Sequence, residues 1–166
     1  VYQRDSHGVP PQGYALLLSM NALMVVVFQF PITRRISRFS PMLMMAAGTF
    51  LYSIGFGLYG LANGAVLFVI AMIIITVGEM VVLPVSQALV ARMSPEAMRG
   101  RYLAIYGFSW VIPMAIGPLL AGLIMDYADP RWVWYASLLV GLVSTGIYLV
   151  LLKRGIPRPD PALAQS

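Results

Sequence analysis

The sequence predicts an all-α protein, a polytopic bundle of transmembrane helices. Of its 166 residues, 60% are hydrophobic and 10% are charged, and the mean hydropathy is +0.82. Soluble domains carry about 25% charged residues, so this chain has too little polar surface to cover a globule in water. Five apolar segments follow one another, each near the length of about 20 residues that a helix needs to cross a bilayer. None of them alternates apolar and polar residues, as the strands of a membrane barrel do.

The spans and their flanking segments can be placed along the chain. The five spans are expected at about residues 13–33, 42–62, 65–91, 102–125 and 132–152, within one transmembrane domain over residues 13–153. Residues 1–12 are polar and are expected to form an extracytoplasmic loop. Residues 154–166 contain three prolines and no apolar periodicity, so we expect a disordered cytoplasmic tail.

The basic residues predict the orientation. Nine of the eleven Lys and Arg residues fall after the first span, after the third span or in the tail, and the positive-inside rule makes that side cytoplasmic. Residues 1–12 then lie outside, so we expect a further span before them and interpret the chain as a fragment of a longer protein. The cytoplasmic loop residues of interest are Arg34, Arg35, Arg38, Arg99, Gly100 and Arg101. Arg99 and Arg101 either pair with acids elsewhere in the protein or anchor to lipid phosphates.

Several classes of function have no support in the sequence. The chain has no cysteine, and its single histidine, His7, lies in the predicted outer loop without a cluster of metal ligands, so we expect no metal site. There is no phosphate-binding glycine loop and no nucleophile with a nearby base, so we expect no enzyme activity. The net charge of +5 comes mainly from short loops between spans, which does not favour a nucleic-acid partner.

One acid, Glu79, lies in the middle of the third span. A charged side chain there costs about 2.5 kcal/mol or more, so it is tolerated when it is protonated, faces a wet cavity or pairs with a cation. No Lys or Arg lies inside the five predicted spans. A carboxyl group that binds and releases a proton while facing a cavity is the minimal part of a proton-coupled transporter. The alternative is a neutral Glu79 that is hydrogen-bonded between helices.

The residues around Glu79 support a cavity-facing side of this helix. Thr76 and Ser86 lie three and seven positions away and share its face, and Gln87 lies a little further round. Pro84 removes the hydrogen bond to the carbonyl of Met80 and should bend the helix. That carbonyl is then expected to be open to water or a cation.

Other polar and aromatic residues are candidates for a substrate cavity. Asn21 and Gln29 interrupt the first span and face either the cavity or a hydrogen-bonding partner on another helix. Tyr106, Trp110 and Met114 are spaced by four and share one helix face, which either lines an apolar pocket or packs against lipid and protein. Three further residues predict a bend or gate in the fourth span: Pro113, Gly117 and Pro118.

Small residues predict close helix contacts. The second span carries Ser53, Gly57 and Gly60, and the fourth carries Gly117 and Ala121 as a pair four residues apart.

The stretch "VGEMVVLPVSQALVARMSPEAMRGRYLAIYGFSWVIPMAIGPLLAGLIMD" resembles the tenth and eleventh helices of major facilitator superfamily transporters, closest to the bacterial drug:proton antiporter branch. The residues that carry the resemblance are Gly78, Glu79, Pro84, Pro95, Arg99, Gly100, Gly117, Pro118 and Gly122. "NALMVVVFQFPITRRISRFSP" resembles the eighth helix and the loop after it, although that loop lacks the family's glycine and aspartate.

The resemblance implies that the five spans are helices eight to twelve, the C-terminal half of a twelve-helix transporter in a bacterial inner membrane. Its partners would be the lipid bilayer, the missing N-terminal half and a small-molecule substrate. No cofactor beyond a proton gradient would be needed.

Three functions remain open at this level. The first is proton-coupled efflux of small amphipathic or drug-like molecules by alternating access. The second is proton-coupled uptake of peptides or other small solutes. The third is a non-transporting membrane scaffold.

Overall fold

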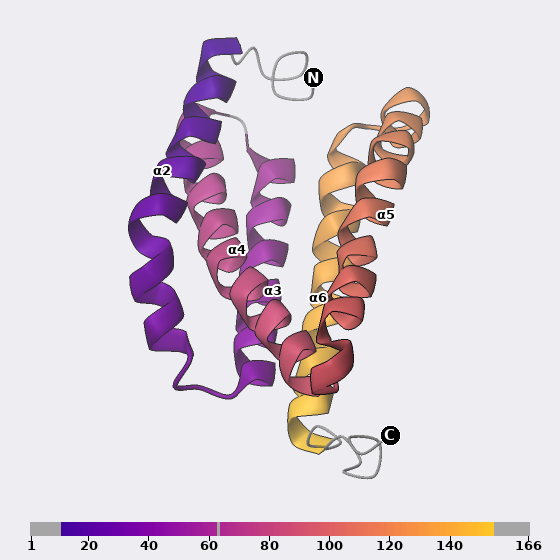
Figure 1. Ribbon diagram of the computed structural model, residues 1–166. Helices are drawn as coiled ribbons and strands as arrows, with labels where there is room; N and C mark the ends of the chain where they lie inside the picture. The colour runs from indigo at the N-terminus through magenta and orange to yellow at the C-terminus, as the bar shows by residue number, and fades with distance from the viewer. Residues whose placement is uncertain (1–10, 63, 155–166) are drawn as a thin grey trace.

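The computed structural model describes residues 11–62 and 64–154, and Figure 1 shows them as a set of long, roughly antiparallel helices. The helices are α2 (Pro11–Ile36), α3 (Pro41–Leu61), α4 (Ala65–Met93), α5 (Arg99–Tyr127) and α6 (Arg131–Arg154), with a short 3-10 helix η1 (Glu96–Met98) before α5. All five long helices are apolar and long enough to cross a membrane. The described residues contain no strand, which confirms the predicted all-α class.

The helices extend past the predicted spans at several ends. Arg34 and Arg35, expected in a loop, form the last turn of α2, where positive charge is favourable beside the helix C-terminus. Arg99, Gly100 and Arg101 are likewise in the first turn of α5 rather than in a loop. Helices continue because the hydrocarbon core limits only the apolar part of a helix, about 20 residues. Residues 1–10 and 155–166, most of the predicted outer loop and tail, lie outside the described residues.

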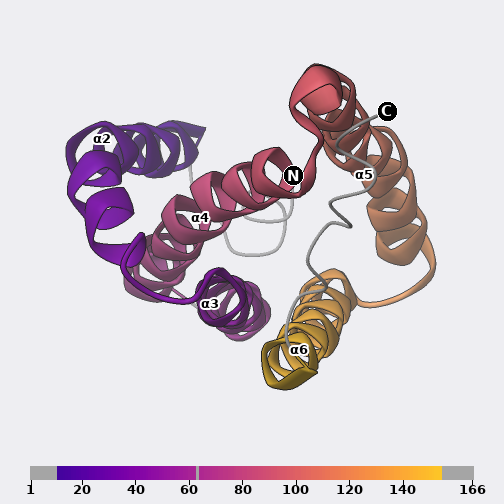
Figure 2. The same cartoon turned by 60° about the horizontal axis from the view of Figure 1, so that its bottom comes forward.

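Helix α3 is at the centre of the packing. It has extensive contacts with α4 on one side and α6 on the other, while α2 lies along α4. Figure 2 shows this arrangement from one end, with α2 and α6 on opposite sides of the α3–α4 pair. Aromatic rings reinforce the end near the α3–α4 turn, where Tyr59 of α3 stacks on Trp134 of α6 with ring centroids 5.0 Å apart.

Small residues allow α3 to approach both neighbours. A Cβ atom added at Gly57 would lie 3.1 Å from Leu138 of α6, and one added at Gly141 of α6 would collide with Ser53. On the other side, a Cβ at Gly78 of α4 would lie 3.0 Å from the carbonyl oxygen of Gly48. The prediction of close contacts is confirmed for Ser53, Gly57 and Gly60, because Gly60 also meets Tyr135. At Gly117 it is wrong within the described residues, since a Cβ there would have no atom within 4 Å.

Helix α5 is the most loosely held element. None of its residues is buried, and its contacts with α4 and α6 are few. A largely apolar cavity of about 430 Å³ separates it from α3 and α6. The residues that line this cavity include Tyr52, Phe56, Gly117, Leu120, Ile124 and Val140.

Candidate functional site

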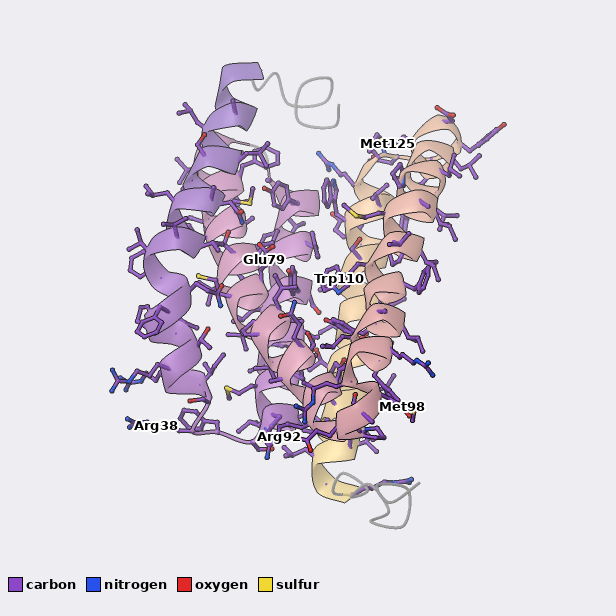
Figure 3. The ribbon with its side chains drawn as sticks, in the orientation of Figure 1. Arg38, Glu79, Arg92, Met98, Trp110 and Met125 are labelled. Atoms are coloured by element: carbon purple, nitrogen blue, oxygen red, sulfur yellow. The ribbon has the colours of Figure 1, made fainter. Side chains whose placement is uncertain are left out.

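Glu79 lies midway along α4, and Figure 3 shows it well away from Arg38 and Arg92 at one end of the bundle. The side chain is half-buried by the described helices. Tyr52 of α3 interacts electrostatically with it. Among the described residues, the interactions that involve this carboxyl group come from two neutral side chains, Asn21 and Tyr52.

Asn21 of α2 contacts this carboxyl group directly. Its Nδ2 atom donates to Oγ1 of Thr76 over 2.8 Å and to Oε2 of Glu79 over 3.2 Å. Thr76 is fully buried, and its own hydroxyl donates to the carbonyl oxygen of Met72 over 2.8 Å. The structure thus brings three predicted residues together across the α2–α4 contact. Of the two alternatives for Asn21, it shows the interhelical hydrogen bond.

A second amide bridges the same two helices two turns further along α2. Nε2 of Gln29 donates to the carbonyl oxygen of Met80 over 3.1 Å and to Oγ1 of Thr33 over 2.9 Å. The Met80 carbonyl lacks its usual helical partner, because Pro84 has no N–H to donate. We expected this carbonyl to be open to water or a cation. That expectation is wrong, because an amide in a low-dielectric region gains most by pairing with an acceptor that lacks a partner.

Ser86 forms a separate contact between α4 and α5. Its hydroxyl lies 2.6 Å from Oη of Tyr106, and it also donates to the carbonyl oxygen of Leu83 over 3.0 Å. Trp110 stands edge-on to the ring of Tyr106, with centroids 6.5 Å apart. Met114, on the same face of α5, is 77% exposed. These four residues form a polar-to-apolar strip from α4 along α5, distinct from the Glu79 contact.

The remaining predicted residues are spread over the bundle. Gln87 is exposed on α4, beside the buried Ser86. Pro84 lines a small groove of about 160 Å³ between α2, α3 and α4. Pro113 and Pro118 lie inside α5, which continues through both as a helix.

The arginines gather at the end of the bundle that was predicted to be cytoplasmic. Arg34, Arg35 and Arg38 line an open hollow of about 430 Å³ with two phenylalanines, Phe30 and Phe39. Nε of Arg99 donates to the carbonyl oxygen of Ala91 over 3.1 Å, near the end of α4. This bond provides a partner for one of the terminal carbonyls of α4.

Two residues of the site were missed from the sequence. Thr33 accepts a hydrogen bond from Gln29 four residues earlier, and this spacing on one helix face could have indicated it. Tyr52 lies on another helix and interacts with Glu79 electrostatically, and no local pattern in the sequence indicates that. Within residues 11–62 and 64–154, no group of three or more His, Asp or Glu residues is placed to hold a metal ion.

Comparison with known proteins identifies the family. The family model of the Major Facilitator Superfamily matches residues 2–165. The chain belongs to the Major Facilitator Superfamily. It is an integral membrane protein of a transporter family, and the five apolar helices fit a lipid bilayer as their environment.

Several curated proteins resemble the chain. YqjV of Bacillus subtilis, an uncharacterized MFS-type transporter, is 29% identical over 81% of this chain and 33% of its own length. The multidrug efflux pump SdrM of Staphylococcus aureus is 29% identical over 75% of this chain and 28% of its own length. A Na⁺, Li⁺, K⁺/H⁺ antiporter of Planococcus maritimus is 26% identical over 64% of this chain and 25% of its own length. No solved structure is a significant match. The chain spans about a third or less of these relatives.

Proposed function

We propose that this chain is part of a secondary active transporter that exports small amphipathic or drug-like molecules in exchange for protons. The observation that carries the proposal is the position of Glu79, half-buried midway along α4 and hydrogen-bonded to Asn21 of α2. An ionisable group at this depth is by default a functional group of a membrane protein.

Proton exchange fits the surroundings of Glu79. A carboxyl group binds one proton and releases it again, which is the chemistry that proton exchange needs. Asn21 donates to the carboxylate form, so the site offers a partner when the proton has left. The relative named as an H⁺ antiporter supports proton coupling, and the relative named as a multidrug efflux pump supports export.

A substrate path beside α5 fits the second group of residues. Tyr106, Trp110 and Met114 form a continuous, partly exposed face with one hydroxyl group at its end. Aromatic and methionine side chains bind varied apolar molecules, because the rings offer large flat surfaces and methionine adapts its shape.

The proposal includes a longer protein in a bacterial inner membrane. The relatives are about three to four times as long as the region that they match, and many transporters place the substrate site between two repeated halves. We propose that an N-terminal half covers the exposed faces of α4 and α5. We also propose that the arginine-rich end, with the C-terminus, is cytoplasmic.

Replacing Glu79 tests the proposed function. In the protein expressed from its complete natural coding sequence, Glu79→Gln should reduce proton-driven dye export at least about tenfold, since the amide cannot release a proton. Glu96→Gln, at an exposed acid in η1, is the matched control and should keep full export. Export is measured as dye loss from energised cells and as uptake into inverted membrane vesicles.

The outcomes separate the alternatives. Unchanged export by Glu79→Gln would remove Glu79 from the coupling mechanism. Dye or peptide accumulation inside energised cells would indicate an uptake permease. If the unaltered protein moved none of the tested solutes, the result would favour the non-transporting scaffold.

A further inference from the structure

We propose that Asn21 is a positioning residue that transmits the protonation state of Glu79 to the contact between α2 and α4, with Gln29 as a fixed pivot. The inference rests on the proposed proton exchange at Glu79 and deepens it. It follows from the direction of each hydrogen bond around the two amides.

The donors and acceptors around Asn21 leave one arrangement. The hydroxyl hydrogen of Thr76 is committed to the carbonyl oxygen of Met72, so Thr76 offers Asn21 only lone pairs. An ionised Glu79 also offers only lone pairs. Both acceptors are met by the same nitrogen, Nδ2 of Asn21, over 2.8 Å and 3.2 Å. The amide is therefore oriented with its nitrogen toward α4.

Protonation of Glu79 disturbs this arrangement. The hydrogen bond from Asn21 is charge-assisted only while the carboxyl group is ionised, and it weakens when a proton is added. The protonated acid also becomes a donor that seeks an acceptor. The oxygen of Asn21 could accept from it only if the amide turned, and turning would place that oxygen against the lone pairs of Thr76. The two forms of Glu79 consequently favour different positions of α2 relative to α4.

Gln29 holds the other end of the same contact independently of any proton. Its Nε2 atom donates to the carbonyl oxygen of Met80 and to Thr33, and neither acceptor titrates. Gln29 lies eight residues after Asn21, which is about 12 Å along a helix. A change at Asn21 with Gln29 fixed would tilt α2 about its Gln29 end. That end lies beside the point where Pro84 removes one backbone hydrogen bond from α4.

The titratable groups around this contact are few in the described residues. From α3, Tyr52 interacts with Glu79, and from α5, Tyr106 is paired with Ser86 two turns along α4. The charged residues of α2 are Arg34 and Arg35 in its last turn, beyond Gln29. Glu79 is therefore the acidic side chain of this contact among the described residues.

Two measurements on the same membrane samples test the inference. Infrared difference spectra report the carbonyl band of a protonated Glu79, which Glu79→Gln removes. Spin labels on the exposed residues Leu16 and Ile70, each replaced by cysteine, report the α2–α4 distance at the Asn21 end. Labels at Phe30 and Gln87 report the Gln29 end; these 166 residues contain no cysteine, and any cysteine elsewhere in the complete protein is first replaced by serine.

We expect the Leu16–Ile70 distance to change by about 2 Å between mildly alkaline and mildly acidic pH, the size of typical helix shifts. The Phe30–Gln87 distance should stay constant. Asn21→Leu should abolish the first change while the Glu79 carbonyl band still titrates. Asn21→Ala is a second variant for the case in which Asn21→Leu does not fold.

Two results would overturn the inference. In the first, the Leu16–Ile70 distance still changes with pH in the Asn21 variants. In the second, that distance does not change in the protein with Asn21 although the Glu79 carbonyl band titrates. If the unaltered protein shows no carbonyl band that depends on Glu79, the proposed proton exchange fails as well. The two failures are therefore distinguishable in one set of samples.

Discussion

Gln29 shows how a side chain can stabilise a proline within a membrane helix. Pro84 removes one backbone hydrogen bond from α4. A carbonyl left without a partner is costly in a hydrocarbon environment, because no water can replace the missing donor. The side-chain amide of Gln29 takes the place of the missing N–H and also ties α2 to α4. One residue thereby gives the Met80 carbonyl a donor and holds α2 against α4 beside Glu79.

Replacing this amide should weaken the fold. Gln29→Leu leaves the Met80 carbonyl without its donor, and we expect a loss of about 1–3 kcal/mol in the free energy of unfolding. Gln87→Leu, the same change at an exposed position on α4, is the matched control and should be neutral. Thermal unfolding midpoints in detergent or lipid compare the two. Equal midpoints for both variants would contradict a structural role of the Gln29 bond.

At the scale of elements, α3 organises the described bundle through its small residues. Gly48 and Gly55 let α4 approach one face, while Gly57, Gly60 and Ser53 let α6 approach the other. Between apolar helices in lipid, close packing must supply much of the association energy, since the lipid is as apolar as the side chains. The contact between α3 and α6 therefore depends on the absence of bulk at a few positions.

Two glycines of α6 provide a matched test of this contact. In Gly141→Ala the new methyl group would collide with Ser53, whose Cα atom is only 3.3 Å away, so the helices must separate. We expect destabilisation of about 1–3 kcal/mol. In Gly146→Ala the methyl group meets no atom within 4 Å, and the variant should be neutral or slightly more stable. Tm measurements distinguish them, and a reversed order would refute close packing at Gly141.

At the scale of the whole molecule, the described helices leave apolar surface uncovered. Helix α5 has no buried residue, and the cavity beside it opens between α3 and α6. Lipid can cover an apolar face of a helix, but the half-buried Glu79 and the hydroxyl groups near Tyr106 need polar surroundings or protein. This imbalance supports the proposal that the chain acts within a longer transporter.

The proposed orientation is testable with single cysteines, since these 166 residues contain none and any cysteine elsewhere in the complete protein can be replaced by serine. Cysteine at Gly64, in the turn before α4, should react with a membrane-impermeant maleimide added to intact cells. Cysteine at Ser37, between α2 and α3, should react only after the membrane is opened. The two sites lie at opposite ends of α3, so they serve as controls for each other. The opposite labelling pattern would reverse the orientation inferred from the basic residues.

The sequence by itself determined the class of this protein and the number of its spans in the described region. Bilayer thickness requires long apolar segments, so length and hydropathy are sufficient to predict five helices. The cost of charge in lipid likewise singles out Glu79 without any structure. Helix periodicity placed Thr76 on the same face as Glu79, because residues three apart on a helix are neighbours.

Only the tertiary structure decided which partners those side chains meet. Asn21 pairs with Thr76 and Glu79 across 55 and 58 residues of chain, and Gln29 reaches Met80 across 51. Helix periodicity indicates which face a residue occupies, but it contains no information about the helix opposite that face. The choice of neighbour depends on where small residues permit close approach, and that depends on all the helices packing together.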